Sequence, residues 1–255
     1  MALSRQVASN TLIHLSGKIL SLILGLVSIS IMTRYLGQEG FGYYTTVVAF
    51  LSFFGILGDF GISLTTIQLI TKPNADVNRT MNGIMSLRII TSVLFLALAP
   101  IVVLFFPYNI FIKLGVLITA FSFVIAAIIQ SLTGVFQKEL KMFEITIAEL
   151  AGRLLLVGII VIAALNHASI YWIFAGISAA NILNLIIAYV YSKRFIAWKW
   201  VVDKELWKTV WHQTWPIALS ISFNLIYLKT DTIILSLTHS QSDVGLYGAT
   251  YRVID

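Results

Sequence analysis

Seven ionisable residues occur inside stretches of the sequence that are otherwise apolar. Four are cations and three are carboxylates, namely Lys18, Arg88, Arg153, Lys229, Asp59, Glu149 and Asp231. A charge in the hydrocarbon layer of a membrane is costly, so such residues usually face a bundle interior or a water-filled cavity. Their chemistry is ion pairing and the binding of charged groups. A central hydrophilic cavity would account for all seven together.

The spacing of polar residues puts some of these charges on one side of a helix. In the first apolar stretch, polar and small residues recur every three or four positions, at Asn10, His14, Lys18, Ser21, Gly25 and Ser28. That spacing makes a single stripe along a helix. Similar stripes surround Asp59, Gln130 and Asp231. Stripes of small and hydroxylated residues alone are also typical of helix contact faces, so the charges are what favour a cavity.

The charges could be neutralised within one helix or between helices. Glu149 and Arg153 are one turn apart, which is the spacing of a local ion pair. Such a pair is one alternative to a role for both residues in the cavity. Lys229 and Asp231 point to nearly opposite sides of a helix, so each is expected to have a partner on another helix.

Seven apolar stretches, each long enough to cross the ~30 Å hydrocarbon layer as a helix, must position these residues. They are Leu12 to Met32, Tyr43 to Ile70, Ile84 to Phe106, Leu114 to Phe136, Phe143 to Leu165, Ile170 to Tyr191 and Trp215 to Leu237. Hydrophobic residues form 58% of the chain, charged residues 11%, and the mean hydropathy is +0.92. Backbone groups in lipid must be bonded within their own segment, and the alternation of barrel strands is absent. The sequence therefore predicts an all-α membrane protein, a polytopic helical bundle.

The net charge of +6 does not require a nucleic-acid partner, because most of the basic residues lie in the loops between the apolar stretches. With the N-terminus in the cytoplasm, ten fall on that side: Arg5, Lys72, Arg79, Lys138, Lys141, Lys193, Arg194, Lys199, Lys204 and Lys208. Only Arg34 and Lys113 fall on the other side. The positive-inside rule then predicts a multi-pass membrane protein with a cytoplasmic N-terminus. The chain has no cysteine, which excludes disulfides and thiol catalysis.

One longer connection, residues 193–214, joins the sixth and seventh stretches. Leu206, Trp207, Val210 and Trp211 recur at helical spacing, as in a helix that lies along the headgroups. Five of the six tryptophans fall between Trp198 and Trp215, and tryptophan prefers the membrane interface. We expect an anchoring linker, with a regulatory or partner-binding role as the alternative. Pro216 would then occupy the first turn of the seventh helix.

The sequence carries no enzyme signature. Metal-binding histidine pairs, a nucleophile elbow, a phosphate-binding loop and a dinucleotide fingerprint are all absent, and the four histidines are scattered. We therefore expect no catalytic residue, no metal and no cofactor. Because the sequence contains no ATP-binding domain, any transport is expected to be secondary or driven by another subunit.

An internal repeat indicates a second bundle. Residues 38–44 and 241–247 both fit the pattern Q-x-x-x-G-x-Y directly after a helical stretch, as repeated transporter halves would. We predict an N-terminal lobe of six helices over residues 1–192 and a cytoplasmic amphipathic linker over 193–214. Residues 215–255 are predicted to begin a second lobe, with its first helix and the start of an eighth helix. The sequence is expected to be incomplete; the alternative is a dimer of two short chains.

The motifs along the chain resemble those of the polysaccharide flippase family. The matching segments are Asn10, Thr33-Arg34-Tyr35-Leu36-Gly37, Gly40-Phe41-Gly42-Tyr43, Gly58-Asp59-Phe60-Gly61-Ile62, Asp231, Val244-Gly245-Leu246-Tyr247 and Tyr251-Arg252. This family is part of the multidrug, oligosaccharidyl-lipid and polysaccharide exporter superfamily, whose members have two lobes around a central cavity. The resemblance covers the whole chain.

The resemblance implies movement of undecaprenyl-pyrophosphate-linked sugar units from the cytoplasmic to the outer leaflet of the plasma membrane of a prokaryote. Lys18, Arg88, Arg153 and Lys229 would contact the anionic headgroup by charge and hydrogen bonding. Asp59, Glu149 and Asp231 would pair with these cations or bind a coupling ion. Expected partners are the lipid-linked oligosaccharide, membrane lipids, a polysaccharide polymerase and glycosyltransferases.

Other functions are also compatible with the sequence. A lipid II or spore-cortex flippase and a multidrug antiporter of the same superfamily would share the architecture and differ in cargo. A membrane glycosyltransferase or polymerase belongs to another class, and usually carries a large extramembrane loop. A structural scaffold is disfavoured by the seven intramembrane charges.

Overall fold

The computed structural model describes residues 2–73 and 75–254, and their side chains except those of 2–9, 225 and 252–254. The side chains of Arg5, counted above among the basic residues, and of Arg252, part of the motif Tyr251-Arg252, therefore lie outside the described side chains. The described residues form helices and no strand, which confirms the predicted all-α bundle. Its helices are α1 (Ala2–Asp59), α2 (Ile62–Ile70), α3 (Val77–Val102), α4 (Ile110–Lys138), α5 (Met142–Leu165), α6 (Tyr171–Ser192), α7 (Lys204–Thr238) and α8 (Gln241–Ile254), with a short 3-10 turn at Val103–Phe105.

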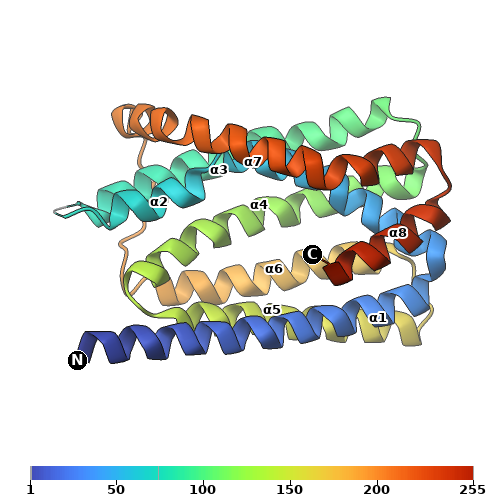
Figure 1. Cartoon of the computed structure of the whole chain (residues 1–255), viewed down its shortest axis with the longest axis horizontal. Coiled ribbons are helices and arrows are strands. Elements are labelled where there is room, and N and C mark those ends of the chain that lie inside the picture. Colours follow the sequence, from blue (N-terminus) through green and yellow to red (C-terminus); the bar gives the residue numbers. More distant parts are fainter. Residues whose placement is uncertain (1, 74, 255) are drawn as a thin grey trace.

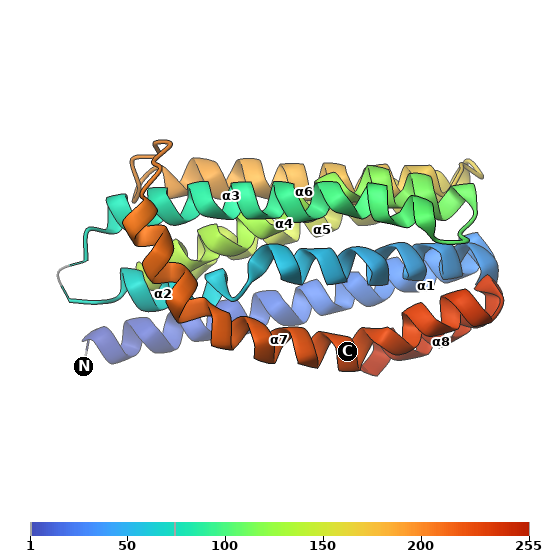
Figure 2. The same cartoon turned by 90° about the horizontal axis from the view of Figure 1, so that it is seen from above.

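Most of the helices run along one long axis of the molecule, whereas the first part of α7 crosses it (Figure 1 and Figure 2). Five of them in the described chain have the length and composition to cross a membrane, or six when the bent α7 is included. All seven predicted stretches fall inside these helices to within one residue at either end. Many large apolar side chains, such as Leu94 and Phe121, are exposed on the outside of the bundle. An apolar exterior of this kind suits lipid rather than water as the solvent.

The first of these segments contains two of the predicted stretches. Asn10–Ile70 has 61 residues, and at 1.5 Å per residue a straight helix of that length would measure about 90 Å, three times the hydrocarbon thickness. The chain instead reverses at Gly37, whose φ of 66° and ψ of −175° glycine adopts most readily. Figure 2 shows the two halves of α1 running side by side in opposite directions.

Two local predictions were wrong. The stretch from Tyr43 to Ile70 is not one continuous helix, because Phe60 and Gly61 have positive φ angles of 47° and 75° and separate α1 from α2. Pro216 does not start a helix either, since it lies inside α7, which begins at Lys204. The break at residues 60–61 is flanked by Gly58 and Asp59. Polar residues between Lys208 and Thr214 put the start of the predicted apolar stretch at Trp215, although α7 already begins in the amphipathic segment before it.

The two copies of the sequence repeat pack against each other where α8 crosses the second half of α1. A Cβ atom on Gly42 would lie 1.8 Å from the Gln241 carbonyl oxygen, and one on Gly245 would lie 1.9 Å from the Gln38 carbonyl oxygen. The side-chain oxygen of each glutamine accepts a hydrogen bond from the other helix: Ser242 donates to Gln38 at 2.8 Å, and Thr46 donates to Gln241 at 2.9 Å. The contacts of the glycines and glutamines are therefore reciprocal, whereas the two donors, Ser242 and Thr46, occupy different positions of the repeat.

A polar ladder fastens the segment 196–202 to the start of α3. The side-chain oxygens of Asn78, Asn82 and Ser86 accept hydrogen bonds from the backbone N–H groups of residues 197, 199 and 201, at 2.9, 2.8 and 3.2 Å. Four residues of helix rise about 6 Å and two residues of extended chain rise about 6.6 Å, so the two spacings match. We call residues 196–202 the strap.

The salt bridge that follows the strap holds the start of α7. Arg79 bonds to Asp203 with a 2.7 Å Nη2–Oδ2 distance, and Asp203 also accepts the backbone N–H of Leu206. That backbone hydrogen bond and the Arg79 guanidinium lower the pKa of Asp203. The carboxylate therefore stays ionised at neutral pH and caps α7.

Removal of one of these side chains should weaken the attachment of the strap to α3. Asn82 is buried and also donates to the Ala197 carbonyl, so Asn82→Ala removes two hydrogen bonds worth about 1 kcal/mol each. We expect the amide of Lys199 to exchange its hydrogen about thirtyfold faster, measured by mass spectrometry. Asn166→Ala is the control, since Asn166 only bonds a carbonyl of its own turn. Equal exchange rates of the Lys199 amide in Asn82→Ala and Asn166→Ala would show that these hydrogen bonds do not hold the strap.

Candidate functional site

A cavity of about 410 Å³ lies among both halves of α1 and helices α4, α5 and α6. Its charged lining residues are Lys18, Glu149 and Arg153, and the same three line an adjoining cavity of about 310 Å³. The structure thus brings three of the seven predicted site residues to one place. His14, on the same stripe as Lys18, also lines the larger cavity.

Glu149 pairs with α1 rather than with its own helix neighbour. Its Oε2 lies 3.3 Å from Lys18 Nζ, and its Oε1 accepts a hydrogen bond from Ser21 at 2.8 Å. The Lys18 side chain remains 51% exposed, so this pair contributes little to stability. Among the described side chains, Arg153 has no ion-pair partner. Two cations and one carboxylate therefore leave this site with one net positive charge.

Uncharged polar groups complete the lining. Gln130 and Asn181 contribute amides, and Thr119 and Asn184 contribute buried oxygen atoms that have no hydrogen-bond partner among the described residues. A buried polar atom without a partner costs about 1–3 kcal/mol. The sequence interpretation did not single out Asn181 and Asn184. Their signal was two amides three residues apart in an otherwise apolar stretch.

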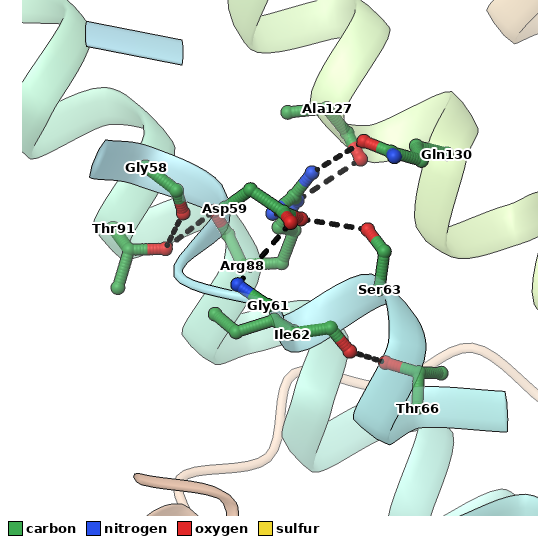
Figure 3. Close-up of polar contacts among 10 residues, drawn as sticks. All are labelled: Gly58, Asp59, Gly61, Ile62, Ser63, Thr66, Arg88, Thr91, Ala127 and Gln130. Atoms are coloured by element: carbon green, nitrogen blue, oxygen red, sulfur yellow. Dashed lines mark hydrogen bonds and ion pairs between the residues drawn. The ribbon is translucent and has the colours of Figure 1, made fainter. Parts of the chain in front are cut away.

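Arg88 and Asp59 form a second, separate group (Figure 3). Arg88 is 1% exposed and forms a salt bridge with Asp59, while its Nε donates to the Ala127 carbonyl at 3.1 Å and its Nη2 to Gln130 Oε1 at 3.0 Å. Asp59 also accepts from the Gly61 N–H at 3.2 Å and from Ser63 at 2.7 Å. The pair holds the break between α1 and α2 against α3 and α4. It reaches the cavity only through Gln130, which Arg88 orients.

Lys229 and Asp231 form a third group, near α8. Asp231 accepts hydrogen bonds from the Tyr247 hydroxyl and from the backbone N–H of Thr232. Lys229 Nζ lies 5.3 Å from the ring centre of Tyr251 and lines a cavity of about 100 Å³. Both contacts to α8 confirm that each residue has a partner on another helix. They also separate Lys229 from the group around Lys18.

The described side chains contain no cluster of three or more His, Asp or Glu residues able to hold a metal ion. A family model described as polysaccharide biosynthesis protein matches residues 7–254. No curated protein and no solved structure shows significant similarity to the chain.

Proposed function

Because the chain belongs to the polysaccharide biosynthesis protein family, we propose that it transports a lipid-linked oligosaccharide across the membrane. The proposed cargo is a polyprenyl-pyrophosphate-linked sugar unit, such as an undecaprenyl-linked repeat, moved from the cytoplasmic to the outer leaflet. This role is transport rather than catalysis. The membrane helices and the family support a membrane protein of polysaccharide biosynthesis.

The observation that carries the proposal is the composition of the cavity around Lys18. A pyrophosphate is anionic, and the free guanidinium of Arg153 with the exposed ammonium of Lys18 would bind its oxygens. The neighbouring side-chain amides of Gln130, Asn181 and Asn184 match the hydrogen-bonding needs of sugar hydroxyls. In this proposal, Glu149 keeps Lys18 in place and is the candidate for a coupling proton or cation.

The remaining predicted residues have positioning roles in this proposal. Arg88 and Asp59 fix the wall of the cavity through Gln130, and Lys229 and Asp231 fix α7 against α8. We further propose that residues 1–192 form one lobe, that 193–214 link it to the second lobe beginning at 215, and that the two rock to give alternating access. A cytoplasmic N-terminus follows from the ten-to-two distribution of basic residues.

Arg153→Gln should reduce transport by about 10- to 100-fold, because a hydrogen bond to a charged group is worth about 1.5–3 kcal/mol. The assay uses liposomes containing the full chain and a fluorescent polyprenyl-pyrophosphate disaccharide, and follows its arrival in the opposite leaflet. Arg153→Lys should keep part of the rate. Lys208→Gln, which removes an exposed cation outside the cavity, should transport normally. Equal rates for Arg153→Gln and the unmodified chain would refute the site. Transport of an organic cation in place of the lipid would refute the cargo.

A further inference from the structure

A second cavity of about 450 Å³ lies on a different side of α4 and α6, under the strap. Its walls come from α3, α4, α6 and the strap, through residues that include Ile89, Leu132, Leu185, Ile186, Trp198 and Lys199. It shares no lining residue with the cavity around Lys18. Its volume lies within the ~300–1,000 Å³ range of small-molecule sites. We call it the strap groove.

The lining of the strap groove is effectively apolar because its polar atoms already form hydrogen bonds within the protein. Ser86 donates to the Asn82 carbonyl and accepts from the N–H of Val201, and the Trp198 indole donates to Ser192 at 2.8 Å. A peptide entering the groove would leave its own N–H and C=O groups without partners, which is costly. A hydrocarbon chain has no such groups. The groove therefore fits a lipid chain better than a polypeptide.

Charge at the mouth of the groove selects among lipids. The Lys199 side chain is exposed and has no carboxylate at ion-pair distance among the described residues. Lys193 lies over the ring of Tyr189, another lining residue, with its Nζ 4.7 Å from the ring centre. Trp, Tyr and Lys side chains at one end of a groove are typical of the headgroup level. Because Lys193 is engaged by the Tyr189 ring, Lys199 is the cation that meets the headgroup, and one such cation favours an anionic lipid by about 1 kcal/mol.

We propose that the strap groove binds one chain of an anionic phospholipid, whose headgroup phosphate contacts Lys199. The occupant is not the tail of the transported lipid. A headgroup in the cavity around Lys18 is separated from the groove by α4 and α6, which present different residues to the two sites. The bound lipid would hold the strap, and with it the start of α7, against α3, α4 and α6. The assignment does not depend on transport.

The test is native mass spectrometry of the full chain released from mixed micelles with equal amounts of phosphatidylglycerol and phosphatidylcholine. The unmodified chain should retain one phosphatidylglycerol in about fivefold preference. Lys199→Gln should lose the preference. Lys204→Gln, which changes an exposed lysine at the start of α7 that does not line the groove, should keep it. Ile186→Trp, at a lining position that is 53% exposed, should block retention of both lipids without unfolding the chain.

Three results would overturn the proposal. The first is equal retention of the two phospholipids by the unmodified chain. The second is an unchanged preference in Lys199→Gln, or unchanged retention in Ile186→Trp with a normal circular dichroism spectrum. The third is displacement of phosphatidylglycerol by added polyprenyl phosphate, which would assign the groove to the carrier lipid.

Discussion

Arg88→Leu is expected to lower the free energy of unfolding by about 3–5 kcal/mol. Arg88 is almost fully buried, and its guanidinium satisfies Asp59, Gln130 and the Ala127 carbonyl at once. Leucine would leave the Asp59 carboxylate half-compensated in a low-dielectric interior, next to the left-handed backbone at Phe60 and Gly61. Denaturant unfolding of the full chain in detergent measures the loss. The free energy of unfolding of Arg88→Lys should lie between those of the unmodified chain and of Arg88→Leu, because an ammonium group cannot reach three acceptors in a fixed plane.

A second arginine on the same helix gives the matched control. Arg79 also pairs with an aspartate, Asp203, but its side chain is 61% exposed. Because exposed ion pairs contribute about 0–1 kcal/mol, Arg79→Leu should change stability far less than Arg88→Leu. The double variant Asp59→Leu with Arg88→Leu should recover part of the loss, since no unpaired charge remains. Similar losses for Arg79→Leu and Arg88→Leu would show that burial of the Arg88 pair is not what matters.

Gly42→Ala is expected to force α1 and α8 apart and to cost about 1–3 kcal/mol or more. The added Cβ would lie 1.8 Å from the Gln241 carbonyl oxygen, whereas a carbon–oxygen contact needs about 3.3 Å. The two backbones must therefore separate by about 1.5 Å, which also stretches the hydrogen bonds of Gln38 and Gln241. The chain has no cysteine, so introduced cysteines at Leu57 and Leu246 can carry spin labels that report this separation.

Gly158→Ala is the control for this substitution. Gly158 lies inside α5, and a Cβ atom there would have no neighbour within 4 Å. Alanine in a helix interior is favoured over glycine by about 0.5–1 kcal/mol, so this variant should be slightly more stable. Gly245→Ala should behave like Gly42→Ala because the contact is reciprocal. An unchanged label distance in both Gly42→Ala and Gly245→Ala would contradict the close crossing of α1 and α8.

The sequence by itself determined the class of the fold and the place of nearly every helix. The length of each apolar stretch and the need to bond the backbone within it are local properties, so they can be read without knowing what packs against what. The ionisable residues inside these stretches were visible for the same reason. The repeat of Gln38 and Gly42 at Gln241 and Gly245 was also visible, although it gave no hint that the two copies touch.

Tertiary structure decided which of these residues act together. Glu149 pairs with Lys18 on another helix rather than with Arg153 one turn away, and Arg88 is withdrawn from the Lys18 cavity by Asp59. The strap and its groove depend on the register between α3 and a segment more than a hundred residues later. Helical phase fixes the side of a helix on which a residue lies. The rotation and depth of each helix against its neighbours fix its partner, and these follow from the packing of the whole bundle.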